Sequence, residues 1–256
     1  MRQKLTKITK RAFNWAGLEI TRLRPPQNLI GMEPSYVFPI IAELYCSSYN
    51  SGDIVQIGAN DGINADPIFQ LLRRHQDHRA ILVEPVRSKF ESLRRNYKSR
   101  NNTLFANIGI SDYNGTAEIY SFDESHAGLP NWAPLVISLD RKIVESHLNS
   151  IEMASLSVPP KIVSETIQLR TMESLIKEYE INEISILQVD TEGHDAKIVN
   201  MVLDAGLKPT MINFEAKHLQ FEEIESLVAR INELGYKCLI LHNDLLAVDT
   251  IAIGIE

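Results

Sequence analysis

The side chains best suited to catalysis lie in two short segments, "VDTEGHD" (189–195) and "NFEAKHL" (213–219). Each segment begins at the end of a strand-like apolar run, and each combines carboxylates with histidine. Such side chains accept protons near neutral pH and bind divalent cations. If the two strands are neighbours in a parallel sheet, both segments meet at one edge of that sheet. The candidate catalytic residues are Asp190, His194, Glu215 and His218.

This set supports two ways of activating a hydroxyl group. His218 or His194 can act as a general base, because histidine is the side chain that titrates near neutrality. Alternatively, Asp190, Glu215 and His218 bind a divalent cation that lowers the pKa of the hydroxyl. We favour the histidine base, since no H-x-x-H or clustered cysteine pattern marks a metal site in these two segments. The plain alternative is structural, with Asp190 capping a helix and His194 solvated in its first turn.

A third segment, "DIVQIGANDG" (53–62), runs from apolar residues into a glycine turn. A dinucleotide fingerprint needs three glycines spaced G-x-G-x-x-G, but these positions hold Gly58, Asn60 and Ile63, so two of the three fail. The remaining pattern is G-x-N-x-G, in which Gly58 and Gly62 let the backbone approach a ligand. Asn60 offers an amide for hydrogen bonding. The segment therefore predicts a ligand site that does not grip a pyrophosphate.

Glu84 follows the second strand in "LVEP", 22 residues after Gly62. A carboxylate at this place in a doubly wound sheet can accept hydrogen bonds from both hydroxyls of a ribose. A surface acid at a strand end is the plain alternative. Ribose recognition without a pyrophosphate loop favours an adenosine ligand whose tail is not phosphate, and S-adenosylmethionine fits that description.

Strand-like and helix-like patterns alternate along the chain from Asp53 onward. The strand-like segments are 53–57, 80–84, 103–110, 115–122, 184–190, 211–215, 236–242 and 245–253. The helix-like segments between them are 65–75, 88–98, 171–180, 195–206 and 222–235. We therefore predict an α/β protein with a Rossmann-like, doubly wound and mostly parallel seven-stranded sheet that has an antiparallel C-terminal strand. Segment 115–122 adds an extra strand.

The motifs resemble those of the FkbM-family methyltransferases over about residues 50–220. "VQIGANDG", "LVEP", "NIGISDYNGTAEIY", "TMESL", "LQVDTEGHDAKIV" and "INFEAKHL" fall in the order found in that family. The resemblance implies a class I methyltransferase that uses S-adenosylmethionine, usually on hydroxyls of sugars, polyketides or other metabolites. Gln56 departs from the Asp common in the family, and a neutral amide would hold the cofactor's ammonium group less strongly. The cofactor-binding residues implied are Gln56, Gly58, Asn60, Asp61, Glu84, Asn107, Ile108, Asp190 and Glu192.

Segment 122–165 is too long for a plain connection within a compact domain. We predict a lid-like insertion that shapes the acceptor pocket, with His126, Trp132 and His147 as pocket candidates. Surface histidines on a lid helix are an equally open interpretation. The insertion belongs to a single methyltransferase domain over residues 36–256.

The first 24 residues carry seven basic side chains and one acidic one, a net charge of +6 within a total of −7. The rest of the chain therefore carries −13, which argues against nucleic acid as a partner. We divide off residues 1–35 as a basic helical extension and linker. Residues 1–24 either form an amphipathic helix in peripheral contact with an anionic membrane or pack as a helix on the body, and we favour packing.

Only Cys46 and Cys238 occur, which favours a reducing compartment, and we expect a cytoplasmic protein. No apolar run of about 18 residues predicts a transmembrane helix. The sequence thus predicts S-adenosylmethionine-dependent O-methylation of a small-molecule or glycan hydroxyl, and a divalent cation remains an open second cofactor. The alternatives are an NAD-dependent Rossmann-like enzyme acting on a sugar nucleotide and a non-catalytic cofactor-binding protein of methyltransferase descent. The oligomeric state and the acceptor's identity are left open.

Overall fold

The central strands of the protein are buried along their whole length. In the computed structural model, β1 (Asp53–Ile57), β2 (Ala80–Val83) and β8 (Ile184–Val189) contain only buried residues. Unbroken burial of aliphatic runs is typical of parallel strands that are covered by helices on both faces.

The structure describes residues 37–241, 243–249 and 252. The predicted basic extension and linker, 1–35, and its membrane contact therefore lie outside the described residues. Within the described part of the chain, no helix combines the length and the apolar character needed to cross a bilayer.

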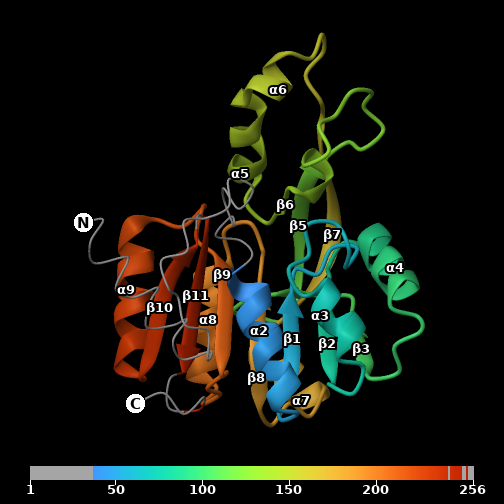
Figure 1. The fold of residues 1–256 in the computed structure, drawn as a ribbon. Coiled ribbons are helices and arrows are strands. Elements are labelled where there is room, and N and C mark those ends of the chain that lie inside the picture. Colours follow the sequence, from blue (N-terminus) through green and yellow to red (C-terminus); the bar gives the residue numbers. More distant parts are fainter. Residues whose placement is uncertain (1–36, 242, 250–251, 253–256) are drawn as a thin grey trace, which may run out of the picture.

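The main sheet has seven strands in the order β10-β11-β9-β8-β1-β2-β3 (Figure 1). All its neighbouring pairs are parallel except those of β11, which runs antiparallel to both β9 and β10. The predicted Rossmann-like sheet with an antiparallel C-terminal strand is therefore confirmed. The four strands not yet given bounds are β3 (Thr103–Ala106), β9 (Met211–Glu215), β10 (Tyr236–Leu241) and β11 (Asp244–Asp249).

Helices cover both faces of this sheet because the side chains of each central strand alternate between the faces. Val55 of β1 packs with the helices that follow β7, β8 and β9, whereas Ile54 packs with those near the start of the chain. The first group is α7 (Met172–Glu178), α8 (Asp195–Asp204) and α9 (Phe221–Glu233). The second group is α2 (Val37–Ser48), α3 (Phe69–Arg74) and α4 (Arg87–Asn96).

The predicted third strand, 103–110, is wrong as a single element. β3 ends at Ala106, and 109–110 form β4, which belongs to a second, four-stranded sheet of order β4-β7-β5-β6. The chain bends between them, where the Asn107 side chain donates hydrogen bonds to backbone carbonyl oxygens of the 84–85 loop. The strands of this sheet are β4 (Gly109–Ile110), β5 (Gly115–Phe122), β6 (Ile137–Ser138) and β7 (Ile162–Arg170).

The predicted extra strand at 115–122 is confirmed as β5, whereas β7 was not predicted. β7 pairs antiparallel with β5 along its length, from Gly115 opposite Leu169 to Phe122 opposite Ile162. Alternation of buried Ile167 and Leu169 with exposed residues was the available signal for a strand.

The insertion rises beyond the carboxyl ends of the main-sheet strands (Figure 1). Its short helices have a small core of their own, which includes Phe122, Val136 and Val144. Whether the insertion moves as a lid stays a prediction. Its helical elements are η2 (Ala133–Leu135), α5 (Arg141–Ser146), η3 (His147–Asn149) and α6 (Ile151–Ala154).

Packing within the protein leaves no room for a side chain at either glycine of the turn after β1. Gly58 has φ +83, and a Cβ added there would lie 1.8 Å from the backbone oxygen of Asp190. A Cβ on Gly62 would meet Leu93 and Tyr97 at 2.5 Å, so this glycine faces α4. The expectation that Gly62 admits a ligand is therefore wrong, because its missing side chain makes room for a helix.

We expect Gly58→Ala to destabilise the fold far more than Gly206→Ala. Both glycines have left-handed φ, +83 and +79, but nothing lies within 4 Å of a Cβ at Gly206. The control should lose about 1–2 kcal/mol from the left-handed conformation alone. Gly58→Ala should lose about 3 kcal/mol more, because backbone must move. Urea unfolding of both variants measures the difference, and equal losses would contradict the close approach of the two chains.

Candidate active site

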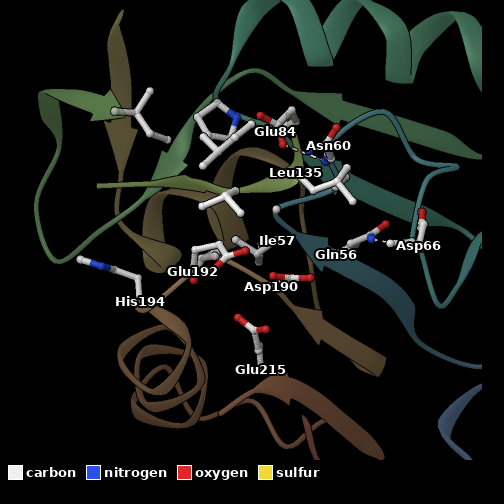
Figure 2. A pocket seen from close by; sticks show the side chains of 18 of the residues that line it. Gln56, Ile57, Asn60, Asp66, Glu84, Leu135, Asp190, Glu192, His194 and Glu215 are labelled. Atoms are coloured by element: carbon white, nitrogen blue, oxygen red, sulfur yellow. Dashed lines mark hydrogen bonds between the residues drawn. The ribbon is translucent and has the colours of Figure 1, made fainter. Parts of the chain in front are cut away.

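A cavity of about 630 Å³ opens at the carboxyl ends of β1, β8 and β9. Residues of these strand ends line one side, and residues of the insertion, including Trp132 and His147, line the other. The volume is in the range of sites for small molecules and cofactors. Figure 2 shows the strand-end side chains around it.

Glu84 is held at the wall of this cavity by backbone amides. Its Oε2 accepts a hydrogen bond from the Asn60 N–H and its Oε1 from the Val86 N–H, both at 2.8 Å. Asn60 presents its N–H from a left-handed conformation, φ +47, which asparagine tolerates. Burial raises the pKa of Glu84 to about 7, although the two amide bonds lower it in part. A carboxylate has about four acceptor positions, so Glu84 keeps capacity for ligand hydroxyls.

Gln56 lies on the same wall, with one half of its amide satisfied and the other half not. Its Nε2 donates to Asp66 Oδ1 at 3.3 Å, while Oε1 is buried without a hydrogen-bond partner among the described residues. An unsatisfied buried acceptor is costly, so this oxygen suits an N–H donor of a ligand in the cavity. Asp66 also lines the cavity, and burial raises its pKa to about 6. We did not identify Asp66 from sequence, although its place just before Pro67 at a helix start is a common signal for a capping acid.

The other residues expected to bind cofactor divide into lining and supporting residues. Ile108 lines the cavity, but Asn107 and Asp61 do not. The side-chain amide of Asn107 holds the 84–85 loop by donating hydrogen bonds to the two backbone carbonyl oxygens of that loop. Asp61 Oδ1 accepts the amide N–H groups of residues 63–64 and so shapes the glycine turn.

Three carboxylates gather on the floor of the cavity, each offering an oxygen within 4.8 Å of the others: Asp190, Glu192 and Glu215. Asp190 and Glu215 face one another in Figure 2. Burial, followed by repulsion from Glu192, raises the pKa of Glu215 to about 7. Asp190 is exposed to the cavity but has protein close on its other sides, and the resulting loss of solvation, followed by repulsion from Glu215, raises its pKa well above the usual range. The floor therefore holds carboxyl groups that bind protons more tightly than usual, at the place where the two predicted segments meet.

The two candidate histidines of these segments are placed differently. His194 lines the cavity, but its ring points away from the Asp190–Glu215 pair (Figure 2). His218 lies behind the wall, with Nε2 at 2.7 Å from Glu192 Oε2 and 3.9 Å from Glu215 Oε2. Neither pair is aligned for a hydrogen bond. His218 Nε2, Glu192 Oε2 and Glu215 Oε2 therefore each lack a hydrogen-bond partner among the described residues. That either histidine acts as the base stays a prediction.

Two rings of the insertion, those of Trp132 and His147, lie in a row that ends at His218. The Trp132 and His147 ring centroids lie 5.6 Å apart, and those of His147 and His218 lie 5.4 Å apart. Trp132 Nε1 donates to Glu152. Of the three pocket candidates predicted from sequence, Trp132 and His147 line the cavity. His126 is not among the lining residues.

Asp195 fixes the turn that presents Glu192. Its carboxylate accepts hydrogen bonds from the Thr191 N–H, the Thr191 hydroxyl and the Gly193 N–H, at 3.2, 3.0 and 3.1 Å. Burial raises the pKa of Asp195 to about 6. Glu192 itself has a left-handed φ of +50. The position of Glu192 is thus set by a buried acid that is not part of the cavity wall.

Comparison with known proteins identifies one family. A family model described as "Methyltransferase FkbM domain" matches residues 56–238. A search of curated proteins found no match.

Solved structures of several methyltransferases are similar at low sequence identity. A precorrin-6y C5,15-methyltransferase from Geobacter metallireducens is 11% identical, with a TM-score of 0.42 and coverage of 87% of this chain and 90% of that chain. A methyltransferase from Geobacter sulfurreducens is 9% identical, with a TM-score of 0.42 and coverage of 96% and 88%. The delta-N METTL16 methyltransferase domain is 10% identical, with a TM-score of 0.41 and coverage of 94% and 93%.

We expect Asp195→Ala to lower the free energy of unfolding by about 2–3 kcal/mol, because it leaves buried turn donors unsatisfied. Asp204→Ala, at the other end of α8, is the matched control. Asp204 is 67% exposed and pairs with Arg230, so its loss should cost less than about 1 kcal/mol. Chemical denaturation checks both values, and similar losses for the two variants would show that the 191–193 turn does not depend on Asp195.

Proposed function

We propose that this chain, which belongs to the FkbM family of methyltransferases, transfers a methyl group from S-adenosylmethionine to a hydroxyl of a sugar, glycan or other metabolite. One observation carries the proposal. A single cavity joins the Glu84–Gln56 wall to the carboxylates of Asp190 and Glu215. Cofactor and acceptor can therefore meet inside one site, with proton acceptors beside them.

The residues on the Glu84 side fit S-adenosylmethionine. Glu84 has acceptor capacity left for the ribose hydroxyls, and the unsatisfied Gln56 Oε1 suits the ammonium group of the methionine part. Gly58 brings the chain to the cavity wall without a side chain in the way. When bound, the cofactor supplies a methyl group on a positively charged sulfur, and the acidic floor favours that charge.

The acceptor oxygen must lose a proton as it gains the methyl group. Asp190 and Glu215 face the cavity and can receive that proton, and Glu215 Oε2 has no hydrogen-bond partner among the described residues. The carbon–sulfur bond breaks, the carbon–oxygen bond forms, and the hydroxyl proton passes to a carboxylate. Glu215 is the proposed acceptor of that proton.

The charge of the cavity favours a neutral acceptor. Lys217 is the only lysine or arginine among the described residues that line the cavity. The acidic lining residues are Asp66, Glu84, Glu152, Asp190, Glu192 and Glu215. A phosphorylated acceptor would be repelled by this surface, whereas a neutral polyol can stack on Trp132 and hydrogen-bond to the carboxylates. The proposal is therefore a neutral sugar or polyhydroxylated metabolite.

We expect the purified protein to bind S-adenosylmethionine with a micromolar Kd, about −8 kcal/mol. Glu84→Ala should weaken binding by about 10- to 100-fold, since it removes charged acceptors for the ribose hydroxyls. Glu152→Ala, on the insertion side, should leave the Kd unchanged. Calorimetry measures all three proteins. Absence of binding, or a preference for NAD, would refute the cofactor assignment.

We expect Glu215→Gln to lower turnover by about 10²- to 10⁴-fold while cofactor affinity is preserved, because an amide cannot accept the proton. The assay follows labelled methyl transfer to neutral polyols under saturating cofactor. His194→Ala is the control, since its ring points away from the carboxylates, and it should retain most activity. Equal damage from the two variants would move the proton acceptor to the histidine.

A further inference from the structure

A second group of potential ligands lies beside the carboxylate floor and includes a residue of the insertion. One ligand atom from each of His147, Glu192 and His218 lies within 4.8 Å of the others. The three residues come from separate elements, namely η3, the turn after β8 and the loop after β9. Two imidazoles and one carboxylate form a ligand set that binds divalent transition metals in many proteins.

We propose that His147, Glu192 and His218 bind one divalent transition-metal cation that joins the insertion to the edge of the main sheet. The contact between His218 Nε2 and Glu192 Oε2 carries the argument. These atoms lie 2.7 Å apart, both are buried, and neither has an aligned hydrogen-bond partner among the described residues. Two buried polar atoms this close without a hydrogen bond are expected where both point at a third group.

The ring of His147 has its free nitrogen on the correct side. Its Nδ1 lies 2.9 Å from the backbone oxygen of Ile143, an oxygen that can only accept. The proton of the neutral ring is therefore on Nδ1, which leaves the lone pair of Nε2 for a cation. A metal-binding histidine commonly donates its other N–H to a carbonyl oxygen in this way.

A positively charged group, the ammonium of Lys217, already lies beside the free nitrogen of His147. Its Nζ lies 3.3 Å from His147 Nε2, and the residue is exposed. A flexible exposed ammonium can swing out when a metal binds, so Lys217 competes with the metal for His147. Removing Lys217 should then strengthen metal binding, whereas removing a ligand should weaken it.

The ligand types select among metals. Imidazole nitrogen favours Zn²⁺, Co²⁺ or Fe²⁺ over Mg²⁺, which prefers an all-oxygen shell. The set also differs from the one predicted from sequence, Asp190, Glu215 and His218. His147 and Glu192 take the places of Asp190 and Glu215, and His218 is common to both sets. This site goes beyond the proposed function, because it requires neither the cofactor nor the acceptor.

The test uses the tag-free chain with Trp15→Phe. Of the two tryptophans in the sequence, only Trp132 then remains. Titration with Co²⁺ should quench Trp132 fluorescence, since its ring centroid is 5.6 Å from that of His147. Calorimetry with Zn²⁺ should give one site per chain, and Mg²⁺ should bind at least about 100-fold more weakly. His147→Ala, Glu192→Gln and His218→Ala should each lower Zn²⁺ affinity about 100-fold or more.

Two further variants keep the test sharp. His75→Ala removes a member of the other histidine-containing group, His75, Asp77 and His78, and should leave Zn²⁺ binding and quenching unchanged. Lys217→Ala should bind Zn²⁺ more tightly than the parent. Circular dichroism establishes that each variant is folded. The proposal is overturned if no stoichiometric Zn²⁺ binds, if His75→Ala abolishes binding, or if folded His147→Ala binds as the parent does.

Discussion

The contact between the ends of β1 and β8 sets the geometry of the whole site. Gly58 and the backbone oxygen of Asp190 approach so closely that no side chain fits between them. At this point the strand order changes direction, because the chain continues from β1 to β2 on one side and β8 lies on the other. Such a switch point opens a crevice at the carboxyl ends of the strands. The Glu84 wall and the acidic floor lie on opposite sides of that crevice.

The carboxylates of this region are of two kinds, which differ in their hydrogen-bond partners. Glu84 and Asp195 are each held by backbone N–H groups, which compensate for the loss of water. Asp190, Glu192 and Glu215 instead face one another, with raised pKa values for Asp190 and Glu215. The first kind shapes the walls. The second kind lacks such compensation, so a positive group or an added proton would stabilise it.

The insertion completes the site from outside the main sheet. The paired strands β5 and β7 lead into and out of the insertion, and the insertion has a small core of its own beside η3. His147 thereby reaches His218, and Trp132 packs beside it. The apolar residues of the insertion provide one wall of the cavity, opposite the polar strand ends. This apolar wall and the acidic floor are thus contributed by different parts of the described chain.

The sequence by itself determined the parallel sheet and the carboxylates at the ends of β2, β8 and β9. These features are local, since burial on two faces requires continuous apolar runs, and ligands approach where such runs end. The cap of α7 is equally local, since the Thr171 side chain accepts a hydrogen bond from the Ser174 N–H three residues later. Only the tertiary structure decided what pairs with what. The partner of Gln56 in Asp66, the pairing of β7 and the meeting of His147 with Glu192 and His218 depend on contacts between distant segments. No periodicity records such contacts, because they arise from how the sheet and the insertion pack together rather than from any one stretch of chain.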